Sequence, residues 1–215
     1  MEIIEWILHL DKHLAEFADQ LGPWFYGLLF AIIFGETGLV IAPFLPGDSL
    51  LFAVGALAAS QPDSLSIAVL LPLLIVAAII GDAVNYAIGK WVGPQIFRKE
   101  TGWLLNKNHL LRAQAFYDKH GAKAIVLARF LPILRTFAPF VAGIGGMQYR
   151  RFWLYNVVGG VAWVSLFLIG GYAFGTRPFV KDRFPLVILA IVVISALPIA
   201  YEWFKAYRES RAAKL

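Results

Sequence analysis

The chain has 215 residues, a formal net charge of +5 and no cysteine. Hydrophobic residues make up 60% of it and the mean hydropathy is +0.69, which indicates an integral membrane protein and excludes an ordinary soluble domain. The absence of cysteine excludes disulfides, thiolate metal sites and a thiol nucleophile. The basic charges lie beside the apolar segments, so they indicate membrane topology and not a nucleic-acid partner.

Residues 1–21 predict an amphipathic helix at the membrane interface. Apolar residues, among them Ile7, Leu10 and Leu14, recur at helical spacing, while the acidic residues fall largely on the other side. Gly22-Pro23 ends the pattern. A soluble amphipathic helix that packs on the membrane domain is the alternative interpretation.

Residues 24–60 predict a re-entrant hairpin, which enters and leaves the membrane by one face. The apolar run from Trp24 meets Glu36, breaks at Pro43, Pro46 and Gly47 and then resumes at Ser49. Each arm is too short to span, because ~20 helical residues are needed. A proline-broken segment is tolerated in lipid only where the freed backbone groups are enclosed by protein.

A full span is predicted over residues 65–90. Near its end, Asp82, Asn85 and Tyr86 lie at i, i+3 and i+4 and share one helical face. This face is either a proton route or second layer of polar contacts, or a surface for helix packing with an interfacial tyrosine. A polar cytoplasmic segment is expected to follow over residues 93–123.

Residues 124–146 predict a second re-entrant hairpin, broken at Pro132 and Pro139. Its sequence Ala128-Arg129-Phe130-Leu131-Pro132 nearly repeats Ala42-Pro43-Phe44-Leu45-Pro46 of the first hairpin. Together the hairpins place Glu36, Asp48, Arg129 and Arg135 within apolar sequence, where each costs roughly 2.5–3.5 kcal/mol unless it meets a partner or water. Two further spans are predicted at residues 152–174 and 184–204.

The distribution of Lys and Arg orients this topology. Thirteen fall on the predicted cytoplasmic side and four outside, which places the N-terminus outside and the C-terminus in the cytoplasm. Hairpin plus span then occurs twice in opposite orientations. The predicted fold is therefore all-α, a single membrane domain over residues 1–215, built as an inverted repeat with a further C-terminal span.

Other interpretations of these residues remain open. Glu36 and Asp48 are alternatively structural salt-bridge partners of Arg129 and Arg135, and Asp48 is alternatively a helix cap. Seven glycines predict close helix contacts rather than phosphate cradles, namely Gly143, Gly145, Gly146, Gly159, Gly160, Gly170 and Gly171.

Five motifs resemble the DedA family of bacterial inner-membrane proteins, which is related to the VTT or SNARE-associated membrane proteins. They are Glu36–Val40, Pro43–Leu51, Gly81–Tyr86, Ala128–Phe130 with Pro132, and Arg135–Gly143. The resemblance implies movement of undecaprenyl phosphate carrier lipid, or of phospholipid, between leaflets, driven by the proton-motive force. It also implies that Glu36, Asp48, Arg129 and Arg135 are the functional residues.

The predicted function is thus a lipid transporter, with phosphate bound by Arg129 and Arg135 and proton coupling at Glu36 and Asp48. No cofactor or metal is expected. An enzyme is not expected either, since all four histidines fall outside the predicted spans. The alternatives are a proton-coupled cation or drug antiporter and an envelope-maintenance scaffold, and the oligomeric state, a homo-oligomer included, stays open. Supporting roles are expected for Pro46, Gly47, Asp82, Asn85, Tyr86, Pro132 and Pro139.

Overall fold

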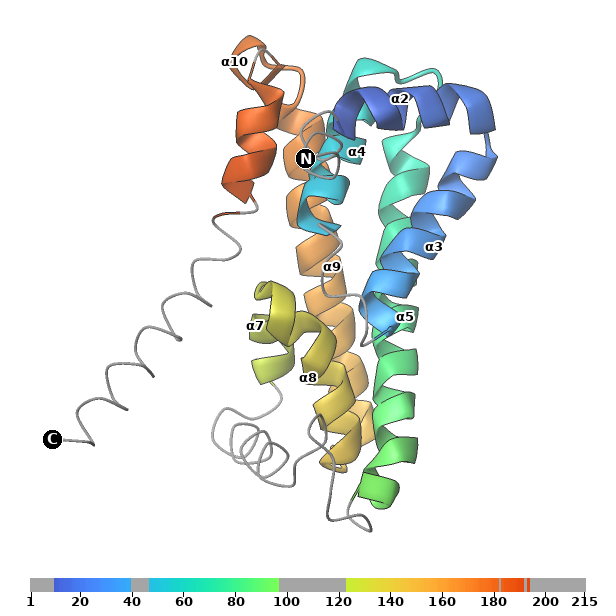
Figure 1. Ribbon diagram of the computed structural model, residues 1–215, viewed down its shortest axis with the longest axis vertical. Helices are drawn as coiled ribbons and strands as arrows, with labels where there is room; N and C mark the ends of the chain where they lie inside the picture. Colours follow the sequence, from blue (N-terminus) through green and yellow to red (C-terminus); the bar gives the residue numbers. More distant parts are fainter. Residues whose placement is uncertain (1–9, 40–46, 97–122, 182, 192, 194–215) are drawn as a thin grey trace, which may run out of the picture.

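The computed structural model describes residues 10–39, 47–96, 123–181, 183–191 and 193. Their regular structure is entirely helical, which fits the predicted all-α membrane protein. Two helices, α5 (Ile67–Ile96) and α9 (Tyr149–Phe174), are long and apolar enough to cross a membrane. They contact each other and run along the long axis of the molecule (Figure 1).

Helices α5 and α9 correspond to the predicted spans 65–90 and 152–174. Helix α5 continues to Ile96, beyond the predicted end. Several other predictions fall on residues outside the described ranges. These are residues 1–9 of the amphipathic helix, Pro43 and Pro46, most of the cytoplasmic segment, and residues 192 and 194–204 of the last span.

The first pair of shorter helices is α3 (Trp24–Gly38) and α4 (Gly47–Ser60). The apolar run from Trp24 forms α3 and carries Glu36 near its end. Helix α4 has Asp48 in its first turn, where a carboxylate interacts favourably with the helix dipole. With 15 residues, α3 is ~22 Å long and covers about half of α5. Both helices lie beside the same half of the long helices (Figure 1).

The second pair is α7 (Lys123–Arg129) and α8 (Pro132–Ile144). Leu131 between them is extended, at φ −117° and ψ 107°, as expected for a residue that precedes proline. Proline at the start of α8 suits the first turn of a helix, where its missing N–H has no partner to lose. This pair lies beside the other half of the long helices (Figure 1).

The packing of the two pairs follows one rule. We call α3, α4 and α5 unit 1, and α7, α8 and α9 unit 2. The first short helix of each unit packs on the long helix of its own unit, α3 on α5 and α7 on α9. The second short helix packs on the long helix of the other unit, α4 on α9 and α8 on α5. The units are therefore interlocked through two helix crossings.

Both crossings are built on the same arrangement of glycines. In each, a Cβ atom on either glycine would lie about 2 Å from the carbonyl oxygen of the residue three places before the other glycine. The four contacts, glycine to carbonyl oxygen, are Gly55 to Leu168 at 2.1 Å, Gly171 to Phe52 at 2.0 Å, Gly143 to Tyr86 at 2.1 Å and Gly89 to Phe140 at 2.1 Å. Only glycine permits backbones this close, so the predicted close contacts at Gly143 and Gly171 are confirmed. The same prediction is wrong for Gly146 and Gly170, where a Cβ atom would meet nothing within 4 Å, and for Gly145, where it would meet only Val141 of α8.

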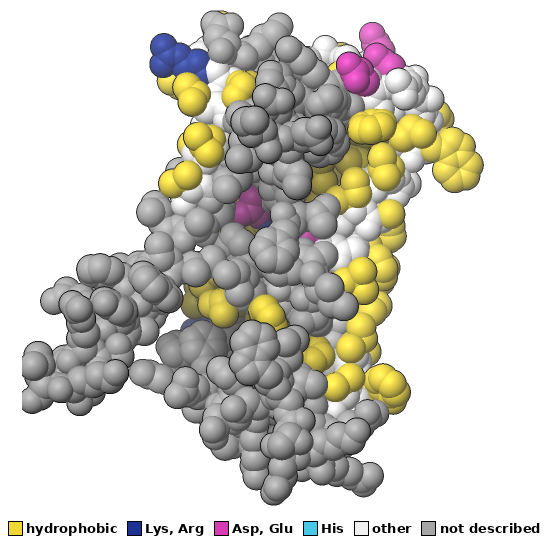
Figure 2. All heavy atoms as spheres, in the orientation of Figure 1, with side chains coloured by type: hydrophobic (Ala, Val, Ile, Leu, Met, Phe, Trp, Pro, Cys, Tyr) yellow, Lys and Arg dark blue, Asp and Glu magenta, His cyan; other side chains and the backbone are white. Residues whose placement is uncertain are grey.

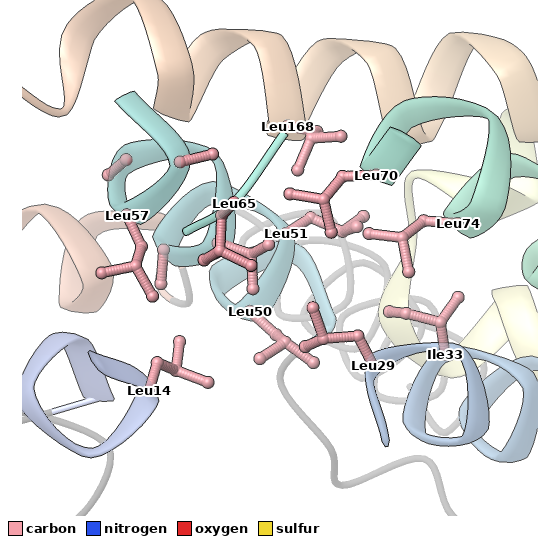
Figure 3. Packing of buried hydrophobic residues seen from close by; sticks show 14 of the residues in the cluster. Leu14, Leu29, Ile33, Leu50, Leu51, Leu57, Leu65, Leu70, Leu74 and Leu168 are labelled. Carbon is pink, nitrogen blue, oxygen red and sulfur yellow. The ribbon is translucent and has the colours of Figure 1, made fainter. Parts of the chain in front are cut away.

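Leucine-rich packing fills the space between α3, α4, α5 and α9. Leu29 and Ile33 of α3 meet Leu51 of α4 and Leu74 of α5, and all four are essentially buried (Figure 3). Helix α2 (Leu10–Leu21) lies across one end of the bundle, where its Leu14 joins the same core (Figures 1 and 3). Residues 184–191, which follow α10 (Pro178–Lys181), are helical and add Phe184 and Ile188 to this core.

The outer surface of the described helices is apolar. Hydrophobic side chains run along the visible edge of α3 and α5, whereas charged side chains are visible at the upper end and in the interior between the helices (Figure 2). On α5 and α9 the exposed positions include Val69, Val76, Ile80, Leu166 and Ile169. An apolar outer surface over a polar interior is the arrangement that a lipid environment requires.

Candidate functional site

Among the described residues, five charged side chains are buried where the short helices end beside the middles of α5 and α9. Unit 1 provides the carboxylates and unit 2 provides the guanidinium groups. None of the five residues is more than 7% exposed. They are Glu36 near the end of α3, Asp48 at the start of α4, Asp82 in the middle of α5, Arg129 at the end of α7 and Arg135 near the start of α8.

Arg135 holds both carboxylates of the first helix pair. Its Nη1 donates to Asp48 Oδ1 at 2.7 Å, and its Nη2 forms an ion pair with Glu36 Oε1. The same Glu36 oxygen accepts the backbone N–H of Gly47 at 3.1 Å, which connects the end of α3 to the start of α4. Arg135 therefore links α8 of the second pair to both helices of the first pair.

Arg129 has a different partner. Its Nη2 forms an ion pair with Asp82 Oδ2 and also donates to Asn156 Oδ1 at 2.7 Å. Asn156 in turn donates to the carbonyl of Ile79 at 3.0 Å, so an amide of α9 is fixed to α5. Nη1 of Arg129 is buried and has no hydrogen-bond partner among the described residues. It faces Gly160 of α9, where a Cβ atom would lie 3.1 Å away.

Trp163 of α9 connects the two arginines. Its ring lies 4.6 Å from the Arg135 guanidinium carbon and 5.9 Å from that of Arg129. Its indole N–H donates to Asp48 Oδ1 at 2.8 Å. The residue is fully buried, so both cation–π contacts are shielded from water.

Asn85 fixes both pairs of short helices to α5. Its amide donates to the carbonyl of Thr37 at 3.1 Å and to that of Thr136 at 2.7 Å. Tyr86, the next residue, serves packing instead. Its hydroxyl donates to the carbonyl of Met147 at 2.5 Å, and its ring stacks on Phe152 with the centroids 4.4 Å apart.

The structure brings Glu36, Asp48 and Arg135 together as one group of the predicted site residues. It pairs Arg129 with Asp82, which the sequence had placed among the supporting residues. Of the remaining supporting residues, Gly47 bonds Glu36, Pro132 begins α8, Pro139 is buried inside α8, and Pro46 lies outside the described residues.

Sequence reasoning missed Asn156 and Trp163. Asn156 had one signal, because an amide is unusual within the uncharged run 152–176. Trp163 had none, since a tryptophan in such a run is ordinary. Within the described residues no cluster of histidine, cysteine and acidic side chains has the geometry of a metal site.

Comparison with known proteins places these residues in a family. The model of the VTT domain matches residues 45–173, which contain all five buried charged residues except Glu36. Protein DedA of Escherichia coli K12 is 50% identical over 213 residues, which cover 99% of this chain and 97% of that protein. The chain belongs to the DedA family.

Other membrane proteins are similar to the chain over most of their length. An uncharacterized membrane protein of Mycobacterium tuberculosis is 44% identical over 85% of this chain and 80% of its own. The inner membrane protein YghB of Escherichia coli K12 is 38% identical over 81% of this chain and 78% of its own. No solved structure matches the chain. With its two apolar long helices, this DedA-family member is a membrane protein.

Proposed function

We propose that this protein moves a lipid phosphate, a polyprenyl phosphate or a phospholipid, between the leaflets of the bacterial inner membrane without chemical conversion. The observation that carries the proposal is the pair of buried arginines between two long apolar helices. A guanidinium binds phosphate oxygens through a planar fork and stays charged at every physiological pH. Buried between α5 and α9, such a group favours an anion that arrives with an apolar tail.

The packing supports an inverted repeat of re-entrant hairpins. The two short helix pairs lie beside opposite halves of α5 and α9 (Figure 1), and the same glycine contacts recur in both crossings. In this architecture the substrate site lies between the repeats near the midplane of the membrane. We place the N-terminus outside and the C-terminus in the cytoplasm, as the Lys and Arg distribution predicts.

The charges of the site support coupling to protons. Glu36, Asp48 and Asp82 carry three negative charges when ionised, against two positive charges on Arg129 and Arg135. A lipid phosphate adds one or two further negative charges, so proton uptake is the natural compensation. Moving each negative charge inward against an inside-negative potential costs roughly 2.3 kcal/mol per 100 mV, and one proton carried with it cancels that cost.

The test is leaflet-to-leaflet movement of a labelled polyprenyl phosphate in proteoliposomes, with and without an inward proton gradient. We expect wild-type protein to move the lipid faster than empty liposomes do, and faster still with the gradient. Arg129→Gln should abolish this movement, because glutamine keeps much of the side-chain volume and lacks the charge. The matched control is Arg177→Gln, which changes an exposed arginine after the end of α9 and should move lipid like wild type.

A wild-type rate equal to that of empty liposomes under every gradient would contradict the proposal. The excess of carboxylates over guanidinium groups favours one other candidate, a proton-coupled cation antiporter. Glu36 Oε2 and Asp82 Oδ1 are buried oxygens without a partner among the described residues, as a cation ligand would be. Cation-dependent proton release from the same liposomes, without lipid movement, would identify that function.

A further inference from the structure

The two arginines differ in how many of their bonds an incoming anion has to replace. Arg135 has a carboxylate on each terminal nitrogen, Asp48 on Nη1 and Glu36 on Nη2, and its face lies on Trp163. Arg129 bonds Asp82 and Asn156 through Nη2 alone, and its Nη1 is buried without a partner among the described residues. The Nε of Arg135 is also buried without a partner among the described residues, but only Arg129 has a terminal nitrogen without one. Arg129 is therefore the arginine whose terminal nitrogens are more available to an anion.

A phosphate that bonds Arg129 at both terminal nitrogens must take Nη2 as well as Nη1. Nη2 is occupied by Asp82 Oδ2, so bidentate binding of the phosphate by Arg129 requires the Arg129–Asp82 ion pair to break. The other partner of Nη2, Asn156, is neutral and remains fixed to α5 through its amide. The competition is thus between two anions, the substrate phosphate and the Asp82 carboxylate.

Asp82 is left in an unfavourable position when it loses Arg129. It is 1% exposed, and its Oδ1 has no partner among the described residues even in the closed pair. The other charged groups of the site are Glu36 on α3, Asp48 on α4 and Arg135 on α8, and Arg135 already carries two carboxylates. A buried carboxylate without a cation is strongly disfavoured, and it is neutralised by a proton.

We propose that Asp82 is the residue that takes up the proton when a lipid phosphate displaces it from Arg129. This inference rests on the proposed function and sharpens it, since sequence reasoning had assigned proton coupling to Glu36 and Asp48. Binding of one phosphate brings one proton onto Asp82, and release of the phosphate returns Asp82 to Arg129 and the proton to water. Because a proton is taken up, a tenfold weaker binding of phosphate is expected for each unit of pH rise wherever Asp82 is ionised in the empty site.

The experiment measures protons taken up as farnesyl phosphate binds to the purified full chain in detergent. Binding is followed by calorimetry in two buffers of different ionisation enthalpy at pH 8, where the phosphate itself is already a dianion, since its second pKa is ~6. Farnesol, which lacks the phosphate, reports binding of the hydrocarbon chain. We expect about one proton per phosphate for wild type and none for Asp82→Asn, which still binds.

The control is Asp63→Asn, the same substitution in an exposed loop, which should take up protons like wild type. Glu36→Gln should also keep the uptake of one proton if it binds. A variant Asp82→Asn that binds farnesyl phosphate and takes up as many protons as wild type overturns the inference. If wild type binds farnesyl phosphate no better than farnesol, the proposed function itself is wrong, and the inference with it.

A second measurement covers the case in which Asp82→Asn does not fold, since it leaves Arg129 without a carboxylate. Asp82→Glu keeps the charge. In an infrared difference spectrum of farnesyl phosphate binding, a protonated carboxyl group gives a carbonyl band whose frequency differs between aspartic and glutamic acid. We expect this band to appear in wild type and to shift in Asp82→Glu. A band that stays in place in Asp82→Glu and shifts in Asp48→Glu or Glu36→Asp overturns the inference.

Discussion

At the scale of single residues, the site depends on Trp163 as much as on its charges. Two guanidinium groups close together repel each other, and the ring of Trp163 offers its electron-rich face to both. Its N–H also holds Asp48 on the side of Arg135. Trp163 therefore sets the spacing of the arginines as well as filling the core between the helices.

Substitution of Trp163 separates these contributions. Trp163→Phe keeps an aromatic face but loses the hydrogen bond to Asp48, so we expect a loss of about 1.5–3 kcal/mol of stability, the usual worth of a hydrogen bond to a charged group. Trp163→Leu also loses both cation–π contacts and should be less stable than Trp163→Phe. Thermal unfolding in detergent measures the stability of both variants. The control is Trp153→Phe, at an exposed position of α9. Equal stability of Trp163→Phe and wild type would show that the hydrogen bond contributes nothing.

Gly160 controls access to Arg129. A methyl group there would lie 3.1 Å from Arg129 Nη1 and 3.0 Å from Ile79 Cγ1, so it would cover the unpartnered donor. We expect Gly160→Ala to weaken farnesyl phosphate binding about tenfold, equivalent to ~1.4 kcal/mol, with little change in the unfolding temperature. Gly170→Ala on the same helix, where a Cβ atom would meet nothing within 4 Å, is the control. Unchanged affinity in Gly160→Ala would mean that the anion does not use Nη1.

Sequence reasoning found the four charges beside the proline breaks because a charge in an apolar segment is costly and has to be explained. It did not find that Arg129 pairs with Asp82 while Arg135 takes both Glu36 and Asp48. Pairing depends on where α7 packs along α9 and α8 along α5, which no local sequence pattern records. Trp163 was missed for a related reason, because only its neighbours distinguish it from an ordinary core residue.

At the scale of helices, the backbone crossings define the arrangement more tightly than the hydrophobic pattern does. The prolines and apolar runs predicted short helices in two pairs, and the structure has helices at those places. The pattern did not predict that α4 packs on the long helix of unit 2 and that α8 packs on the long helix of unit 1. The signal was present as glycines three residues after Phe52, Phe140, Tyr86 and Leu168, but glycine spacing has meaning only once the partner helix is known.

Alanine at the crossings should therefore be destabilising to a similar extent in both units. In Gly55→Ala and in Gly143→Ala the new methyl group would lie 2.1 Å from a carbonyl oxygen of the backbone, which cannot move aside as a side chain does. We expect each to lower stability by about 1–3 kcal/mol, the usual cost of overpacking, measured by thermal unfolding in detergent. Gly27→Ala on α3, where a Cβ atom would meet nothing within 4 Å, should be neutral or slightly stabilising. A large loss of stability in one of Gly55→Ala and Gly143→Ala, with no loss in the other, would contradict the equivalence of the two helix crossings.

At the scale of the whole molecule, the two units have equivalent packing and opposite charge. Unit 1 carries Glu36, Asp48 and Asp82, and unit 2 carries Arg129 and Arg135. Each unit alone would expose its charges to lipid. In the assembled molecule the carboxylates of unit 1 pair with the guanidinium groups of unit 2, which neutralises most of the charge. The proposed inverted repeat also predicts which connecting segments share a side of the membrane.

Cysteine labelling tests this orientation directly, because the chain has no cysteine of its own. Exposed positions are available in the segment between α4 and α5, between α8 and α9, and after α9. We expect Asp63→Cys and Thr176→Cys to react with a membrane-impermeant maleimide added to intact spheroplasts. Gln148→Cys should react only after the membrane is permeabilised. Labelling of Gln148→Cys in intact spheroplasts would contradict the inverted repeat.

The pairing of Arg135 with the first pair of helices has a consequence for how the protein is made. Glu36 and Asp48 precede Arg135 by 99 and 87 residues. At a synthesis rate of ~5–20 residues per second, the two carboxylates exist for roughly 4–20 s before the ribosome adds their partner. During that interval the apolar arms are complete, yet their acidic ends have no cation to meet. We therefore expect the first pair of helices to settle between α5 and α9 only after α8 has been synthesised and Arg135 is available.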